Sequence, residues 1–239
     1  MGSFRPPLDP AFAPLMEEWR ARQIELASRI VERPLAEVPR LIAGADSALS
    51  TDKGWILSAV VVWDREEKRV VEIAHGAAPV RYPYIPGYLS FREAPALEAA
   101  FREVKSPFGL VLFDGMGKAH PRRCGIAAHM GVTLFGLPSL GIPTVGVGKS
   151  RLYGFHREVG PDPGAREPLK DKGEILGTVL RTKAKVKPVY VSVGNLCDLD
   201  SAMQAVEACL RGYRLPEPTR LADREAARFK LEWKEPAPA

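Results

Sequence analysis

Cysteines are scarce in this sequence, and no apolar run is as long as a membrane-spanning helix. The three cysteines, Cys124, Cys197 and Cys209, are an odd number at no metal-ligand spacing, which is typical of free thiols in a reducing compartment. The longest apolar stretches, such as Ile56–Trp63, fall well short of the roughly 20 residues that a bilayer requires, and the N-terminus lacks the pattern of a secretory signal. We therefore expect a soluble cytoplasmic monomer that makes no contact with membranes.

Charge of neither sign dominates the chain. The formal net charge is +5 over 239 residues, and the composition of 46% hydrophobic and 26% charged residues excludes disorder, collagen and coiled coil. Basic residues concentrate in one run, Arg181–Lys187, which has a cation at every second position. An extended strand would place these cations on one face. The run is therefore either an edge strand or hairpin too charged to aggregate or a track for phosphates.

The hydrophobic pattern predicts one α/β domain over residues 1–239, built on a mixed sheet flanked by helices. Strand-like runs cover residues 40–50, 55–63, 69–77, 108–113, 144–147, 174–182 and 188–193. Helical runs cover residues 11–31, about 87–104, 123–134, 200–211 and 218–230. The first three strands, separated by short breaks, should form an antiparallel meander, and later strands joined by crossover helices should be parallel. We expect the core at about 39–230 and a mobile tail at about 231–239.

Three carboxylates occupy apolar surroundings. Asp46 shares a face of its predicted strand with Ile42 and Gly44. Asp114 directly follows an apolar strand, at the sheet edge where ligands bind in open α/β folds. Glu93 lies early in the helix that follows Gly87. Each acid alone is explained by an arginine partner or a helix cap, whereas the three together have the oxygen chemistry of a Mg²⁺ or Mn²⁺ site.

Asp223, on the last predicted helix, is a fourth candidate ligand. Its neighbours Arg220 and Arg224 make a surface ion pair an equally good explanation. Acids flanked by basic residues favour phosphodiester hydrolysis, because a metal ion lowers the pKa of the attacking water and screens charge on the phosphate.

A glycine-rich turn follows Asp114. Gly115 and Gly117 allow the backbone to approach a ligand closely and to offer free N–H groups. The segment is no dinucleotide fingerprint, because His120 stands where that pattern requires its last glycine. His120 either holds a water or a phosphate or caps the turn.

Lys149 ends the segment Gly146-Val-Gly-Lys-Ser150, which has the appearance of a P-loop. Pro143 occupies the position of the first required glycine, so we exclude an NTPase. Lys149 follows a predicted buried strand, as Asp114 does. It either reaches the same sheet edge, where it would neutralise a phosphate, or is a solvated loop lysine.

The segment Pro83-Tyr84-Ile85-Pro86 holds an aromatic residue between two prolines. The prolines restrict the backbone and keep Ile85 extended. A stiff apolar protrusion of this kind can enter a base stack and hold duplex DNA open. The alternative is a loop packed over the core.

Taken together, these segments resemble the endonuclease V family, inosine-directed nucleases of the RNase H-like superfamily. The resemblance runs from about Pro39 to Arg224 and rests on five blocks: LIAGADSAL, PYIPGYLSFRE, VLFDGMGKAHPRRCGIAAHMG, PTVGVGKSRLYG and YRLPEPTRLAD. It implies an RNase H-like mixed sheet, with an antiparallel meander and parallel strands between helices. Two departures concern the pocket: Met116, where the family has polar residues or histidine, and Gly148, where alanine is common.

The resemblance also implies roles for individual residues. Asp46, Glu93 and Asp114 match the metal-binding carboxylates of the family, and Asp223 matches a further acidic or histidine position near the metal. Lys149 matches a lysine implicated in catalysis. The remaining assignments are a wedge of Pro83, Tyr84, Ile85 and Pro86, a lesion pocket of Gly87, Gly115, Gly117, His120 and Gly125, and phosphate contacts from Lys149, Ser150, Arg92, Lys183 and Lys185.

The activity that the resemblance implies is DNA repair. A Mg²⁺-dependent endonuclease, in which Mn²⁺ can substitute, would cut the second phosphodiester 3′ to inosine and leave 3′-hydroxyl and 5′-phosphate ends. The partner is inosine-containing nucleic acid, and the sequence leaves DNA or RNA open. The alternatives are an inosine-specific ribonuclease or other RNase H-like nuclease, and a nucleic-acid-binding relative without catalysis.

Overall fold

The computed structural model describes residues 10–50, 52, 54–136 and 140–235. Its strands are β1 Leu41–Ser50, β2 Trp55–Asp64, β3 Arg69–Pro79, β4 Leu110–Phe113, β5 Thr144–Gly148, β6 Arg166–Asp171, β7 Glu174–Leu180 and β8 Val189–Asn195. Its helices are a short 3₁₀ helix Pro10–Phe12, α1 Ala13–Ser28, α2 Leu89–Glu103, α3 Ile126–Thr133, α4 Leu199–Ala208 and α5 Glu217–Glu232. None of the described helices combines the length and the apolar character needed to cross a bilayer.

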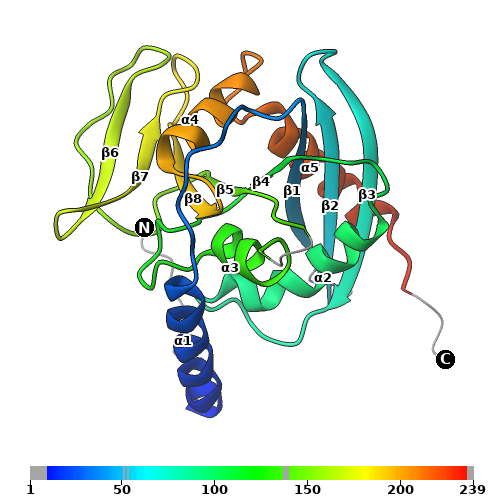
Figure 1. The fold of residues 1–239 in the computed structure, drawn as a ribbon. Coiled ribbons are helices and arrows are strands. Elements are labelled where there is room, and N and C mark those ends of the chain that lie inside the picture. The colour runs from blue at the N-terminus through cyan, green and yellow to red at the C-terminus, as the bar shows by residue number, and fades with distance from the viewer. Residues whose placement is uncertain (1–9, 51, 53, 137–139, 236–239) are drawn as a thin grey trace.

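The strands form one mixed sheet in the order β3-β2-β1-β4-β5-β8-β7-β6 (Figure 1). Strands β1, β2 and β3 form the predicted antiparallel meander. Strands β1, β4 and β5 are parallel at the centre, and β8, β7 and β6 continue the sheet with antiparallel pairing. The prediction of a mixed α/β sheet is confirmed.

Helices cover both faces of the sheet, which buries alternate residues of each central strand in different cores. On one face, Val111 and Phe113 pack with α2 and α3. On the other, Leu110 and Leu112 pack in a core that includes residues of α4. Helix α5 covers β1 and β2, and a Cβ at Gly44 would lie 2.1 Å from the carbonyl carbon of Pro218. Only glycine permits this close contact, which brings α5 over the face that carries Asp46.

Two sequence predictions on the β6–β8 side are corrected by the structure. The run Arg181–Lys187 connects the antiparallel strands β7 and β8, as the hairpin alternative has it, and is not an edge strand. It forms a turn with Lys185 at a positive φ of 62°, so its cations do not share one face. The predictions also missed β6, whose charged sequence REPLKD contains Pro168. A charged strand with a proline is typical of a sheet edge, and β6 lies at the edge.

The C-terminal helix is longer than predicted. It continues to Glu232, and the Trp233 ring lies 5.4 Å from the Trp55 ring, measured between centroids. Packing against β2 therefore extends into the segment that we expected to be a mobile tail. Residues 236–239 of that segment lie outside the described residues.

Candidate metal centre and adjoining cavity

Asp46 and Asp114 are neighbours because β1 and β4 are parallel and in register. Ala45 pairs with Phe113, and the Asp114 N–H donates to the Ala45 carbonyl at 2.9 Å. Asp223 comes from α5, which packs over β1. One carboxylate oxygen from each of the three aspartates lies within 4.8 Å of the others. The fold thus brings together three of the four predicted metal ligands.

Lys149, which follows β5, lies among these acids. Its Nζ is 3.6 Å from Asp46 Oδ2 and 2.5 Å from Asp223 Oδ1, and it also forms an ion pair with Asp114. The predicted placement of this lysine at the same sheet edge is therefore observed. Burial lowers the pKa of Lys149, but the surrounding carboxylates outweigh burial and raise the pKa above its usual value.

The single ammonium does not compensate the buried acids fully. Burial, together with the charge of Asp114, raises the pKa of Asp46 to about 9, and burial also raises the pKa of Asp114. Burial acts in the same direction on Asp223, but its hydrogen bond and charge interaction with Lys149 prevail and lower the pKa.

A divalent cation fits this donor set. Asp114 Oδ2 is buried and accepts no hydrogen bond of good geometry from the described residues, although it lies within ion-pair distance of Lys149. Three clustered carboxylates with an unsatisfied buried oxygen are hard ligands, of the kind that Mg²⁺ and Mn²⁺ prefer. The acid cluster of Asp46, Asp114 and Asp223 could therefore hold a metal ion.

Glu93, the fourth predicted ligand, is outside the three-oxygen cluster. It lies in α2, and burial raises its pKa to about 7, with the charge of nearby Asp114 adding to the shift. Arg92 is only 11% exposed and its guanidinium lies over the Tyr84 ring, 5.5 Å from the centroid. Little of the Arg92 side chain is therefore accessible for the phosphate contact that we predicted for it.

A cavity of about 210 Å³ adjoins the acids. It is lined by Gln23, Tyr84, Gly87, Leu89, Ser90, Asp114, Gly115, Met116, His120, Gly125, Ile126, Gly148, Lys149, Ser150 and Leu152. Most of the predicted pocket residues are in this set. Gly117 is not, because its N–H points into the sheet and donates to the buried Ser192 Oγ at 2.9 Å.

The predicted wedge loop is both packed and projecting. Ile85 is 3% exposed and packs with Trp19 and Tyr88, so it anchors the loop and does not protrude. Tyr84 is 48% exposed at the cavity. The packed-loop interpretation therefore applies to Ile85, and the interpretation of a projecting aromatic residue applies to Tyr84.

Sequence reasoning missed Gln23 and Arg122, which hold one wall of the cavity. The Gly87 carbonyl accepts hydrogen bonds from Gln23 Nε2 (3.1 Å), Arg122 Nη2 (2.7 Å) and His120 Nε2 (2.9 Å). Arg122 Nε also donates to Gln23 Oε1 at 2.6 Å. Gln23 lies 64 positions before Gly87. The sequence of the helix that contains Gln23 gives no indication of this hydrogen bond.

The same network assigns the role of His120. Its Nδ1 accepts from the Arg122 N–H at 3.1 Å, so Nε2 carries the proton and donates to Gly87. Burial lowers the pKa of His120 to about 4. His120 is therefore a neutral residue that shapes the turn, the second of the two roles left open by the sequence.

The two departures from the family pattern contact each other. A Cβ at Gly148 would lie 2.5 Å from Met116 Cε, so the methionine side chain occupies the space of an alanine methyl group. Both residues line the cavity. An alanine at position 148 would therefore require the Met116 side chain to move.

Comparison with known proteins decides the family. A family model described as Endonuclease V matches residues 24–224. This chain belongs to the endonuclease V family. It is 46% identical over 209 residues to an endonuclease V of Azotobacter vinelandii, covering 87% of this chain and 92% of the relative. The predicted nuclease activity is confirmed at the level of the family.

Solved endonuclease V structures share the fold. The Streptomyces avermitilis enzyme superposes with a TM-score of 0.82 at 38% identity, covering 90% of this chain and 93% of that one. The Ciona intestinalis endonuclease V, in complex with a 24mer DNA containing an inosine followed by a ribo-adenosine, has a TM-score of 0.76 at 26% identity, with coverages of 92% and 99%. The protein is thus an endonuclease of the endonuclease V family.

Proposed function

We propose that this endonuclease is Mg²⁺-dependent and hydrolyses the second phosphodiester 3′ to inosine, leaving 3′-hydroxyl and 5′-phosphate ends. The observation that carries the proposal is a shared boundary: Asp114 belongs to the acid cluster, Lys149 forms an ion pair with it, and both residues also line the cavity. If a base is held in the cavity, the backbone of the nucleic-acid strand that carries it lies beside the acid cluster. The Ciona intestinalis relative, solved with inosine-containing DNA, supports hypoxanthine as that base.

The acids have distinct roles in this proposal. Asp46, Asp114 and Asp223 would hold Mg²⁺ or Mn²⁺, with Glu93 acting through water. The metal ion would lower the pKa of the attacking water and screen charge on the phosphate. Lys149 lies among the same three carboxylates. At this place its ammonium group would neutralise negative charge that develops on the phosphate during cleavage.

Selection of the base follows from the cavity and its rim. Inosine pairs weakly, so flipping it out of the duplex costs less free energy than flipping a normal base. The half-exposed Tyr84, held by the buried Ile85 and the flanking Pro83 and Pro86, would fill the gap left in the stack. Hypoxanthine lacks the 2-amino group of guanine, so a closely fitting cavity excludes guanine.

Backbone and surface groups complete the contacts. Gly87, Gly115 and Gly125 line the cavity and would let the backbone approach the base closely. Ser150 beside Lys149, together with the exposed Lys183 and Lys185 of the β7–β8 turn, are our candidates for phosphate contacts.

The test of this function is a panel of substrates. Inosine duplex DNA, the undamaged duplex and an inosine-containing RNA are each incubated with Mg²⁺ or with EDTA. We expect Mg²⁺-dependent nicking of the inosine duplex, and sequencing of the ends should place the cut at the second phosphodiester 3′ to inosine. Cutting of RNA alone would favour the ribonuclease alternative, and no cutting would favour the binding protein.

A wedge variant tests base recognition separately. Tyr84→Ala should weaken binding to the inosine duplex by roughly 1–3 kcal/mol, the contribution of one base–aromatic stack. Its effect on undamaged duplex should be much smaller. Equal losses on the two duplexes would remove the wedge role.

We further propose a single-domain, monomeric protein of the cytoplasm. The continuous sheet supports one domain. Cys124, Cys197 and Cys209 are buried free thiols, as expected in a reducing compartment.

A further inference from the structure

A second cavity adjoins the metal centre. It has a volume of about 380 Å³ and shares Lys149 and Ser150 with the base cavity, but no other described lining residue. Its walls come from the loop after β5, the end of β7 and the start of β8. A strand whose base occupies the first cavity can therefore pass the acid cluster and continue into the second, which we call the exit groove.

The exit groove carries positive charge that the protein does not neutralise. Arg151 and Lys187 line it, are exposed, and form no ion pair with any described residue. Glu158 is the one acidic residue of the described lining. Most exposed arginines elsewhere on the molecule pair with acids, as Arg228 does with Glu225. Unpaired cations that converge on a groove are typical of phosphate contacts.

Two arginines fix the walls that present these cations. Arg214 donates to the carbonyls of Lys149, Lys187 (2.8 Å) and Pro188 (3.0 Å). This residue therefore ties the loop of the metal centre to the start of β8. Charged hydrogen bonds therefore hold the backbone on both sides of the groove, which fixes the points from which the two cationic side chains extend.

Arg181 holds the opposite part of the wall. It donates to the carbonyls of Val159 (3.1 Å), Gly160 (3.0 Å) and Val186. Its guanidinium is thus committed to the backbone, which leaves Arg151 and Lys187 as the cations available to a ligand.

An aromatic pair lies in the same groove. The rings of His156 and Tyr190 are 5.6 Å apart between centroids, at an interplanar angle of 66°, and the Tyr190 hydroxyl is 3.4 Å from His156 Nε2. Aromatic faces beside cations are the usual composition of a single-strand path, where bases stack and phosphates meet positive charge.

We propose that the exit groove binds the nucleic-acid strand on the 3′ side of the cleaved bond, with Arg151 and Lys187 contacting its phosphates. This inference rests on the proposed function for its direction. If the base cavity holds the inosine and the cut falls 3′ to it, the strand that leaves the acids on the other side is the 3′ product. The groove therefore contributes affinity for the DNA beyond the lesion, and this affinity does not depend on the base sequence.

The test compares two inosine duplexes that differ only in the 3′ arm. One ends one nucleotide beyond the cut bond, and the other extends by about one helical turn, roughly 10 base pairs. For the wild-type protein, kcat/KM should be higher on the long arm. Arg151→Ala/Lys187→Ala should lose that gain, and the slope of log rate against log salt on the long arm should become shallower by about 2, one for each lost contact.

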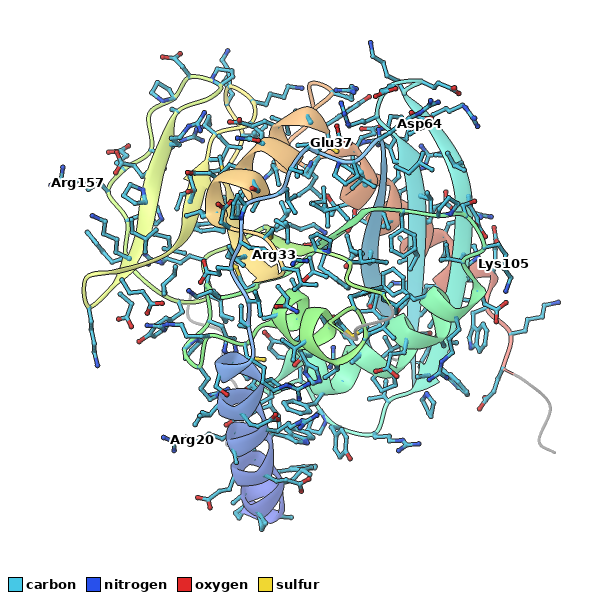
Figure 2. All side chains as sticks on the ribbon, viewed as in Figure 1. Arg20, Arg33, Glu37, Asp64, Lys105 and Arg157 are labelled. Carbon is cyan, nitrogen blue, oxygen red and sulfur yellow. The ribbon has the colours of Figure 1, made fainter. Side chains whose placement is uncertain are left out.

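A matched control removes the same two charges elsewhere. Arg102 and Lys105 are exposed residues at the end of α2 and just beyond it. Lys105 lies on the opposite side of the molecule from Arg157, which follows the groove residue His156 in the chain (Figure 2). Arg102→Ala/Lys105→Ala should keep the gain from the long arm. Equal losses in the two double variants, or an equal loss on the short and long arms, would overturn the proposal.

Binding without cleavage separates this inference from the proposed function. If the wild-type protein cuts no inosine duplex, the proposed function fails. Fluorescence anisotropy in EDTA then still tests the groove, because the wild-type protein should bind the long-arm duplex more tightly than the short-arm duplex, and Arg151→Ala/Lys187→Ala should bind them equally. A long-arm advantage that survives in the variant contradicts the groove.

Discussion

Two acidic clusters lie along β1 and β2, and they differ in how their charges are compensated. The register pairs Asp46 with Ala59 near the middle of the two strands and Leu41 with Asp64 at one end. Each cluster contains a deeply buried aspartate, since the side chain of Asp64 is 2% exposed and that of Asp114 is 8% exposed. The two aspartates differ in the groups that surround them.

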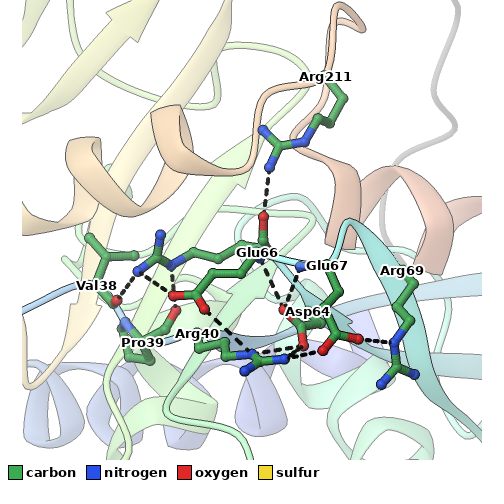
Figure 3. Close-up of polar contacts among 9 residues, drawn as sticks. Val38, Pro39, Arg40, Asp64, Glu66, Glu67, Arg69 and Arg211 are labelled. Atoms are coloured by element: carbon green, nitrogen blue, oxygen red, sulfur yellow. Dashed lines mark hydrogen bonds and ion pairs between the residues drawn. The ribbon is translucent and has the colours of Figure 1, made fainter.

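The Asp64 cluster is fully satisfied by the protein. Asp64 accepts hydrogen bonds from Arg40 Nε at 2.8 Å and from the backbone N–H groups of Glu66 and Glu67 at 3.0 Å each (Figure 3). The Arg40 hydrogen bond is the largest effect on Asp64 and lowers its pKa to about 2. The carboxylate is stable as a charged group without any ligand.

The rest of that cluster is balanced in the same way. Arg40 and Arg69 both pair with Glu67 at 2.5 Å. Arg65 lies 3.7 Å from Glu66, and its carbonyl accepts a hydrogen bond from Arg211. Three acids thus face three arginines, and the hydrogen bonds fix the turn between β2 and β3.

The acid cluster of the metal centre has three carboxylates and one lysine, so its charges are unbalanced. Burial raises the pKa values of Asp46 and Asp114, and Lys149 does not offset it, whereas the hydrogen bond from Arg40 lowers the pKa of Asp64. A buried acid alone is therefore weak evidence for function. What distinguishes the functional cluster is the charge that the protein leaves for a ligand to compensate.

The largest effect that separates the clusters is on catalysis. Asp114→Asn removes one charged metal ligand. Loss of a residue that hydrogen-bonds to a metal ligand typically lowers activity roughly 10–100-fold, so loss of the ligand itself should lower the rate of nicking of the inosine duplex by more than this. Lesion binding in a gel shift should persist. Nicking at the wild-type rate would show that Asp114 holds no metal.

The next effect is the response to metal ions. Mn²⁺ at 100 times its dissociation constant should stabilise the folded wild-type protein by about 2.7 kcal/mol, as measured by urea unfolding. Asp46→Asn should lose most of this stabilisation, and Asp64→Asn should retain it. A Mn²⁺ response that survives in Asp46→Asn and disappears in Asp64→Asn would reverse the assignment of the clusters.

Gln23 belongs to a hydrogen-bond network beside the cavity, and this network, like the Asp64 cluster, is satisfied by the protein itself. Gln23→Ala removes the acceptor of Arg122 Nε and the donor to the Cys124 carbonyl, and each buried group left unpaired costs roughly 1–3 kcal/mol. We expect a lower urea midpoint together with a smaller ratio of inosine-duplex to undamaged-duplex binding. Loss of stability with an unchanged binding ratio would limit Gln23 to a structural role.

The smallest effect on nicking belongs to Asp64→Asn, which should lower the urea midpoint and leave the nicking rate of the folded protein unchanged. The pKa of Asp64 in the folded state, about 2, is below the unfolded value of about 3.9. Its contribution to stability is therefore complete above about pH 4 and is lost as the pH falls towards 2. The difference in urea midpoint between wild type and variant should shrink over that range, and a constant difference would contradict the pairing with Arg40.

Much of the fold could be predicted because its signals are local. Short breaks between β1, β2 and β3 indicated a meander, and the apolar run of β4 indicated a strand buried on both faces. Strand β6 lacked such a signal, since an edge strand needs no apolar face. For residues 181–187 the sequence left an edge strand and a hairpin open, because alternating charge fits both when the contacts of Arg181 are unknown.

The sequence alone determined which residues are candidates for the chemistry. Asp46, Asp114 and Lys149 each stand in or directly after an apolar strand, where a charge is costly unless it is compensated. Only the tertiary structure decided how these groups are divided. It placed Asp223 with the acids and Glu93 outside them, and it balanced Asp64 with arginines. The reason is that compensation depends on distances between segments far apart in the chain, which the spacing of residues along the sequence does not contain.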